Sequence, residues 1–161
     1  MRKKFLIAAL PAMISLLVVS CGKYQKDVWA FLDVKIGDSK EDVKENYGDD
    51  WELNQGDVYA YTNIKSPYDC EEQYVSFLFD SDEIIYSINA TWTLETADEA
   101  KKLFDSLKKK STKQYGDEYE SGKSDNPAEY ARWSSDSSII NISLTDDDLN
   151  GNKVSINIRK E

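Results

Sequence analysis

The sequence predicts an α+β fold in which an antiparallel sheet carries two amphipathic helices. Two segments open with a helix-capping signature and close at a glycine. Several short segments alternate apolar and polar residues with a period of two, as strands with one covered face do. The composition, 40% hydrophobic and 31% charged residues, is that of a globular domain.

The first 20 residues have the anatomy of an export signal. Positions 1–4 carry three basic residues, and positions 5–19 form an apolar run interrupted only by Pro11 and Ser15. A membrane-spanning helix needs about 20 apolar residues, so this run is short for a permanent anchor. We therefore expect residues 1–20 to be a signal peptide that is removed.

A lipid attachment motif follows directly. Val18-Val19-Ser20-Cys21 resembles the lipobox of bacterial lipoprotein precursors. This resemblance implies that Cys21 carries a diacylglycerol thioether and further acyl chains such as palmitate, which together give the stable anchoring that one chain does not. The alternative is a plain secretory signal followed by a coincidental cysteine.

The resemblance to a lipobox predicts a cellular location and a division into domains. We expect residues 21–27 to be a short tether and residues 28–161 to be a single α+β domain. The domain would lie at the cell envelope, outside the cytoplasm and lipid-anchored, and the motif leaves open which membrane holds it. Cys70 could then not pair with Cys21, and would be a small packed residue, a reactive thiol or part of an intermolecular disulfide.

Charge and composition exclude several functions. The chain has 20 basic and 30 acidic residues, and loss of Arg2, Lys3 and Lys4 with the signal would take its net charge from −10 to −13. Such a domain repels phosphate backbones, so we expect no nucleic-acid partner. The chain contains no His, the commonest general base and a common metal ligand. We expect no cofactor and no catalytic residues.

The first predicted helix begins at Ser39, whose hydroxyl caps it, and ends at Gly48. The second begins at the cap Thr96 and ends at Gly116. Its apolar residues recur at helical spacing on one face, which requires a surface to pack on: Ala97, Ala100, Leu103, Phe104 and Leu107.

Alternating segments predict the sheet. The segments 75–79 and 84–92 form a hairpin around an acidic turn. The apolar positions of 140–144 and 154–158 pair across the loop 146–152, and 58–63 and 130–134 make two shorter strands. The resulting order of helix, three strands, helix, three strands suggests a duplicated unit.

A short sequence match supports duplication. Tyr47-Gly48-Asp49-Asp50-Trp51 follows the first helix and matches Tyr115-Gly116-Asp117-Glu118-Tyr119 after the second. Two ordinary glycine caps at helix ends would explain the match equally well.

The first helix also supports a second resemblance. Gly37-Asp38-Ser39, Val43 and Tyr47-Gly48 are similar to the helix-opening motif of small envelope lipoproteins of the BamE/SmpA type and of beta-lactamase-inhibitor-like repeats. Those families often carry Pro soon after the second glycine, where this chain has Asp49-Asp50-Trp51. The resemblance implies a helix-on-sheet domain that binds protein.

Two clusters are candidate ligand sites. Tyr59 and Tyr61 share one strand face and could stack on a ligand, with Val58, Ala60 and Thr62 as the buried set. Trp92 and Trp133 could do the same but fit a core between helix and sheet better.

The second cluster is acidic. Asp146, Asp148 and Asn150 match the opening of a calcium loop, yet the bidentate Glu that such a loop needs is absent. A solvated hairpin loop, with Asn150-Gly151 as the turn, is the alternative that we prefer.

The expected function is therefore binding. The sequence favours a membrane-anchored protein-interaction or envelope-assembly module with an envelope protein as its partner. The alternative is a lipoprotein that binds a small ligand or glycan through surface aromatic residues, and an enzyme ranks third.

Overall fold

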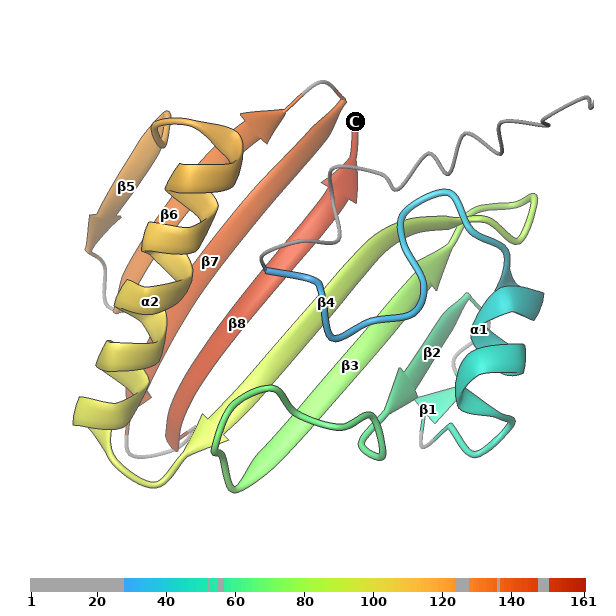
Figure 1. Cartoon of the computed structure of the whole chain (residues 1–161), viewed down its shortest axis with the longest axis horizontal. Helices are drawn as coiled ribbons and strands as arrows, with labels where there is room; N and C mark the ends of the chain where they lie inside the picture. The colour runs from blue at the N-terminus through green and yellow to red at the C-terminus, as the bar shows by residue number, and fades with distance from the viewer. Residues whose placement is uncertain (1–27, 52, 55–56, 124–127, 136, 148–150) are drawn as a thin grey trace, which may run out of the picture.

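The computed structural model describes residues 28–161 apart from 52, 55–56, 124–127, 136 and 148–150. Over these residues the chain forms one eight-stranded antiparallel sheet, in the order β1-β2-β3-β4-β8-β7-β6-β5, and two helices (Figure 1). Each helix is followed by four consecutive strands, and the last strands of the two sets, β4 and β8, pair at the centre. The predicted α+β class and antiparallel sheet are confirmed.

The elements have the following bounds. The first set is α1 Lys40–Tyr47, β1 Leu53–Asn54, β2 Val58–Tyr61, β3 Glu72–Phe79 and β4 Ile85–Leu94. The second set is α2 Ala97–Tyr115, β5 Glu120–Lys123, β6 Glu129–Ser135, β7 Ser138–Asp147 and β8 Gly151–Lys160.

Both helices begin and end where the sequence predicts. Ser39 and Thr96 each form a complete capping box, in which the hydroxyl accepts from the third helical N–H and a carboxylate accepts from the cap N–H. Gly48 and Gly116 end the helices at φ values of 80° and 88°, in the left-handed region that favours glycine.

The expectation of three strands after each helix is wrong, because each helix is followed by four. The two strands missed are the edge strands β1 and β5. β1 has only two residues, and β5 reads Glu-Ser-Gly-Lys with no apolar alternation. An edge strand pairs on one side only and covers little core, so its sequence need not show a buried face.

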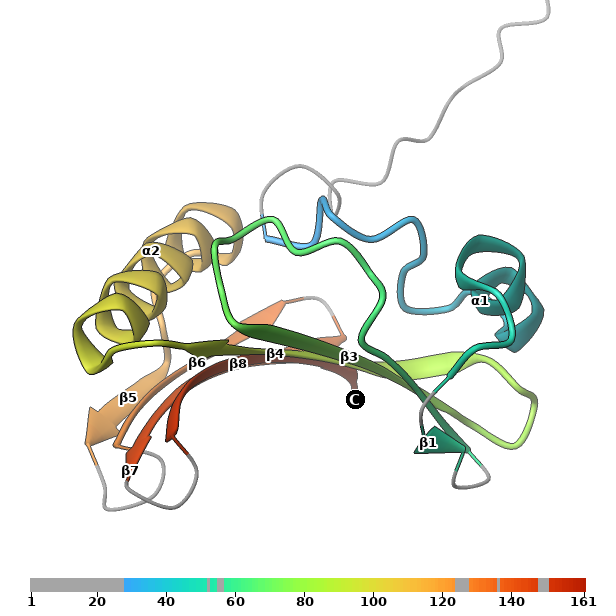
Figure 2. The same ribbon diagram turned by 90° about the horizontal axis from the view of Figure 1, so that it is seen from below.

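One face of the sheet is covered and the other is bare. Figure 2 shows both helices, the segment 28–38 and the loop 62–71 on the same side of the sheet, with the two loops between the helices. α2 buries Ala100, Leu103, Phe104 and Leu107, whereas α1 buries Val43 alone. The sheet is curved, and its helix-free face is concave.

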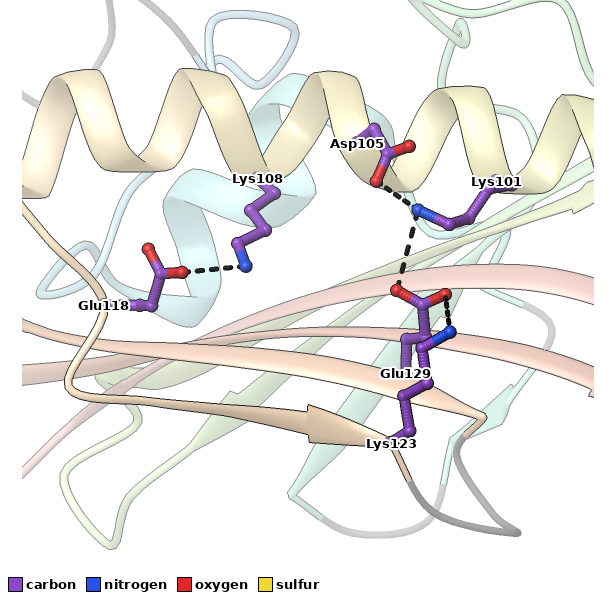
Figure 3. A network of polar contacts seen from close by, with 6 residues as sticks. All are labelled: Lys101, Asp105, Lys108, Glu118, Lys123 and Glu129. Carbon is purple, nitrogen blue, oxygen red and sulfur yellow. Dashed lines mark hydrogen bonds and ion pairs between the residues drawn. The ribbon is translucent and has the colours of Figure 1, made fainter.

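Surface ion pairs connect α2 with the strands beneath it (Figure 3). Lys108 Nζ lies 2.7 Å from Glu118 in the segment that leads into β5. Lys101 bridges Asp105 on its own helix and Glu129 on β6, and Glu129 also contacts Lys123 on β5. Each pair is partly exposed and contributes little alone, and together they link α2 to the β5–β6 end of the sheet.

Candidate functional site

Tyr59 and Tyr61 are core residues. They are 4% and 0% exposed, and their β-sheet partners Phe77 and Val75 are buried on the same face. Trp51 stacks on the Tyr59 ring at a centroid distance of 4.2 Å. The prediction that these two tyrosines face solvent is wrong, because a strand of four residues shows no clear period and the helix side proves to be their face.

The remaining residues that the sequence singled out are two tryptophans and two cysteines. Trp92 and Trp133 are fully buried, as the core interpretation expected. Cys70 is free and half-buried, and its thiol lies 3.3 Å from the Ser66 hydroxyl. Cys21 lies outside the described residues.

The acidic loop gives no evidence for calcium binding. Asp146 lies at the end of β7 opposite Asn152, while Asp148 and Asn150 lie outside the described residues. Among the residues that the structure describes, no group of three His, Cys, Asp or Glu side chains could hold a metal ion.

The bare face of the sheet is the candidate site, and we call it the open face. Its residues are those that alternate along each strand with the side chains beneath the helices, and three of them, Ala60, Ser76 and Ser87, are themselves buried. It is rich in hydroxyl and amide groups, contributed by both halves of the chain. From β2 to β5 in sheet order it comprises Val58, Ala60, Glu72, Tyr74, Ser76, Leu78, Ser87, Asn89, Thr91, Thr93, Lys153, Ser155, Asn157, Arg159, Ile139, Asn141, Ser143, Thr145, Asp147, Tyr130, Arg132, Ser134, Glu120 and Gly122.

A row of polar side chains crosses the open face through directly opposed pairs. The sheet register places Ser76 opposite Asn89, Asn89 opposite Asn157, and Asn157 opposite Asn141. Asn141 in turn lies opposite Arg132, and Arg132 opposite Glu120. Six strands, from β3 with Ser76 to the edge strand β5 with Glu120, thus contribute one polar residue each, which brings together residues far apart in the sequence.

Hydrogen bonds hold the centre of this face. Asn157 Nδ2 donates to the Ser87 hydroxyl at 3.0 Å and to the Ile88 carbonyl oxygen at 3.1 Å. The hydroxyls of Thr91 and Ser155 lie 2.8 Å apart across the same pair of strands. Because these side chains are already ordered by one another, a partner that binds here pays less entropy to fix them.

An aromatic and charged cluster lies at the β5 end of the open face. Arg132 Nη1 donates to Glu120 Oε2 at 2.7 Å, Arg132 Nε donates to Asn141 Oδ1 at 3.3 Å, and the guanidinium lies 5.1 Å from the Tyr130 ring centroid. The hydrogen bond to Glu120 raises the pKa of Arg132 above its ordinary value. A β-carbon at Gly122 would lie 3.0 Å from the Tyr130 hydroxyl oxygen, so glycine makes room for this ring over β5.

The open face does not share the acidity of the chain. By strand alternation its described positions carry three cations, Lys153, Arg132 and Arg159, and three carboxylates, Glu72, Glu120 and Asp147. The whole chain has a net charge of −10. A protein partner can therefore approach this face without carrying the strongly basic surface that the rest of the domain would require.

This face was not predicted from the sequence, because the candidate sites there were a pair of aromatic residues and a metal-binding motif. The signal was nonetheless present in the polar residues of the alternating strands, since Ser87, Asn89 and Thr91 occupy successive outward positions of one strand. Recognising them as one site needed the pairing of β4 with β8, which no local pattern predicts.

Comparison with known proteins gives no functional assignment. No protein-family model matches the chain, and no curated protein matches it. The fold is similar to the crystal structure of a DUF4309 family protein (YjgB) from Bacillus subtilis subsp. subtilis strain 168, with a TM-score of 0.46 and 12% identity over 76% of this chain and 78% of that one. Along the described residues, no helix is both long and apolar enough to cross a membrane.

Proposed function

We propose that this protein is a lipid-anchored, extracytoplasmic and non-catalytic interaction module whose open face binds another envelope protein. The open face is the observation that carries this proposal. It is concave and free of helices (Figure 2), and side chains at its centre are held in place by hydrogen bonds to one another. The lipobox at Val18–Cys21 supports the location, with the partner held near the same membrane.

The dimensions of the open face suit a protein partner. The open face runs over seven strands at about 4.8 Å spacing, which makes it roughly 29 Å wide. The long strands β3, β4, β7 and β8 each present at least four outward residues, which add roughly 20 Å in the other direction, so the face offers a large part of the about 800 Å² that one partner buries in a standard interface. Tyr130 and Arg132 are of the residue types enriched at interface hot spots.

We further infer that the two halves arose by duplication of a helix-plus-four-strand unit. Tyr47-Gly48-Asp49 and Tyr115-Gly116-Asp117 are 68 positions apart. Ser87-Ile88-Asn89 and Ser155-Ile156-Asn157 are separated by the same 68 positions, and the two asparagines lie opposite each other on β4 and β8. The open face would then be built from two equivalent half-faces that meet at its centre.

Site-specific photo-cross-linking in intact cells tests the binding proposal. A photoreactive amino acid at Ser155, in the centre of the open face, should give one discrete adduct with an envelope protein. The same group at Lys109, an exposed position on α2, is the matched control and should not give that adduct. Arg132→Glu should weaken the Ser155 adduct, and equal labelling from both positions would contradict the proposal.

The anchor needs its own test. Cells that express the wild-type chain should incorporate a radioactive fatty acid into it, and Cys21→Ser should abolish both the label and the membrane association. Cys70→Ser is the matched control and should keep both. Label that survives Cys21→Ser would contradict the anchor while leaving the open face unaffected.

A glycan is the second candidate ligand for the same face. The observation that favours it is the row in which Tyr74 and Tyr130 flank the hydroxyls of Thr91, Ser155 and Ser143. Tyrosine rings stack on sugars, and hydroxyl groups pair with them. If a purified cell-wall oligosaccharide competes with the Ser155 adduct and Tyr130→Ala removes that competition, the glycan replaces the protein as the partner.

A further inference from the structure

A second cavity lies on the opposite, helix-bearing side of the sheet. It has a volume of about 270 Å³ and lies beside the segment 28–38. Its floor is formed by Ile88 on β4 and Ile158 on β8, which are directly opposed in the sheet, and its wall includes Trp29, Val34 and Ile36. The cavity therefore occupies part of the central strip that neither helix covers.

The wall is attached to the sheet by backbone hydrogen bonds. Gly37 N–H donates to the Ile85 carbonyl at 2.9 Å, and Ile85 N–H donates to the Asp38 carbonyl at 2.8 Å. Leu32 N–H donates to the Trp29 carbonyl at 3.0 Å and closes a turn around the indole. The cavity is thus formed by the folded chain before any ligand binds, which lowers the cost of binding.

One polar atom in this apolar wall has no partner. Trp29 is 6% exposed, and its Nε1–H is buried with no hydrogen-bond acceptor among the described residues. A buried donor without a partner costs free energy in the folded state. Because this nitrogen has less than 1 Å² of accessible surface, the indole contributes an apolar surface to the cavity wall.

The charged residues at the cavity indicate that a ligand there would be negatively charged. Lys35 and Lys160 line it and are exposed, and neither forms an ion pair within the described part of the chain. Its described lining residues include no Asp or Glu, although the chain has a net charge of −10. A cavity elsewhere on the molecule shows the contrast, since Asp69, Glu71, Glu95 and Glu99 line it beside Lys102.

We propose that this cavity binds a small anionic amphiphile, with the apolar body lying over the floor formed by Ile88 and Ile158 and the carboxylate near Lys35 and Lys160. At roughly 30 Å³ per water-sized group, the cavity holds about nine non-hydrogen atoms. A medium-chain carboxylate such as octanoate has this size and chemistry. This site is separate from the open face, so the proposed ligand and the proposed interaction with an envelope protein can be tested independently.

Fluorine NMR of the full chain provides the test. The chain is labelled with 5-fluorotryptophan and reconstituted in phosphatidylcholine nanodiscs, and its four Trp residues give separate signals that single Trp→Phe variants assign. Octanoate should shift the Trp29 signal saturably. Trp133 is the internal control, because its Nε1 is also buried without a partner yet it does not line the cavity, and its signal should not move.

Charge variants distinguish the contribution of the ligand's anionic head to binding from that of its apolar body. Lys35→Glu combined with Lys160→Glu should weaken octanoate binding by about fivefold, from the loss of two exposed charge contacts, while Lys109→Glu should leave it unchanged. Octan-1-ol should bind more weakly than octanoate. Absence of a saturable Trp29 shift would overturn the site, and equal binding of the alcohol with no effect of the charge reversal would overturn the anionic ligand.

Discussion

Asn89 and Asn157 lie directly opposite each other on β4 and β8, but their side chains do not make equivalent contacts. Asn157 Nδ2 donates to the Ser87 hydroxyl and to the Ile88 carbonyl oxygen at 3.0 and 3.1 Å. Asn89 Nδ2 makes a longer contact of 3.4 Å with the Thr91 hydroxyl on its own strand. Two directly opposed residues of the same type thus contribute unequally to the centre of the sheet.

This asymmetry predicts unequal losses of stability. Asn157→Ala removes two side-chain hydrogen bonds between β4 and β8, so the free energy of unfolding should fall by about 1 to 2 kcal/mol. Asn89→Ala, the matched control, should cost less than half as much. Urea unfolding of both variants measures the difference, and equal losses would show that the hydrogen bonds of Asn157 do not stabilise the strand pair.

Substitution of Gln73 should lower the free energy of unfolding by more, because this buried side chain connects β3 with the loop at Ile64 and with Trp92 on β4. Its Nε2 donates to the Ile64 carbonyl at 2.7 Å, and its Oε1 accepts from Trp92 Nε1 at 2.6 Å. Gln73→Leu keeps the volume but leaves a buried donor and a buried acceptor without partners. The free energy of unfolding should fall by about 3 kcal/mol, measured by urea unfolding.

A double variant provides the control for Gln73. In Trp92→Phe the indole donor is absent, so adding Gln73→Leu should cost clearly less than it does in the wild-type chain. If Gln73→Leu costs the same in both backgrounds, the hydrogen bond to Trp92 contributes nothing to stability.

The sequence predicted the parts of this fold that depend on local chemistry. Ser39 and Thr96 mark helix starts because a hydroxyl followed by a carboxylate satisfies free N–H groups wherever it occurs. The apolar set Ile140, Ile142 and Leu144 pairs with Ile158, Ile156 and Val154 as expected, since period two defines a strand face. The hairpin of β3 and β4 is confirmed for the same reason.

The remaining features depend on contacts between distant segments. Nothing in the sequence near Tyr59 shows which face of β2 α1 and Trp51 will cover. The two tyrosines were therefore predicted to be exposed, whereas Ala60 on the other face is buried as predicted. The open face arises only when Asn89 meets Asn157, and the cavity beside Trp29 only when segment 28–38 crosses the central strands. Such features are set by sheet register and loop path, which period and composition do not determine.

The capping boxes predict how the two helices respond to the loss of a cap. Thr96→Ala removes the hydroxyl that accepts from Glu99 N–H at 3.3 Å, and the free energy of unfolding should fall by about 1 kcal/mol. Ser39→Ala should cost a similar amount. Ser106→Ala, at an exposed position within α2, is the control and should cost less than 0.5 kcal/mol, as is usual for a surface substitution. Thermal unfolding of the three variants provides the comparison.

The raised pKa of the Tyr61 hydroxyl predicts a loss of stability at high pH. Burial raises the pKa of Tyr61 to about 12 from an ordinary value of 10.0, and its hydroxyl donates to the Gly48 carbonyl at 3.0 Å. Because the folded-state pKa lies above the unfolded value, the stabilisation is complete below pH 10 and is lost as the pH rises towards 12. Burial likewise raises the pKa of Tyr47 to about 12, so both rings should contribute to this decline.

The measurement is the free energy of unfolding of wild type and Tyr61→Phe between pH 9 and pH 12. Near pH 9 the wild type should be more stable by about 1 kcal/mol, the value of one hydrogen bond. This advantage should shrink as the pH rises, because the unfolded wild type ionises and the Phe variant cannot. Tyr119→Phe, at a ring that is 57% exposed, is the matched control, and its curve should run parallel to that of the wild type. A constant difference between wild type and Tyr61→Phe across this range would show that the Tyr61 hydroxyl is not held neutral by the fold.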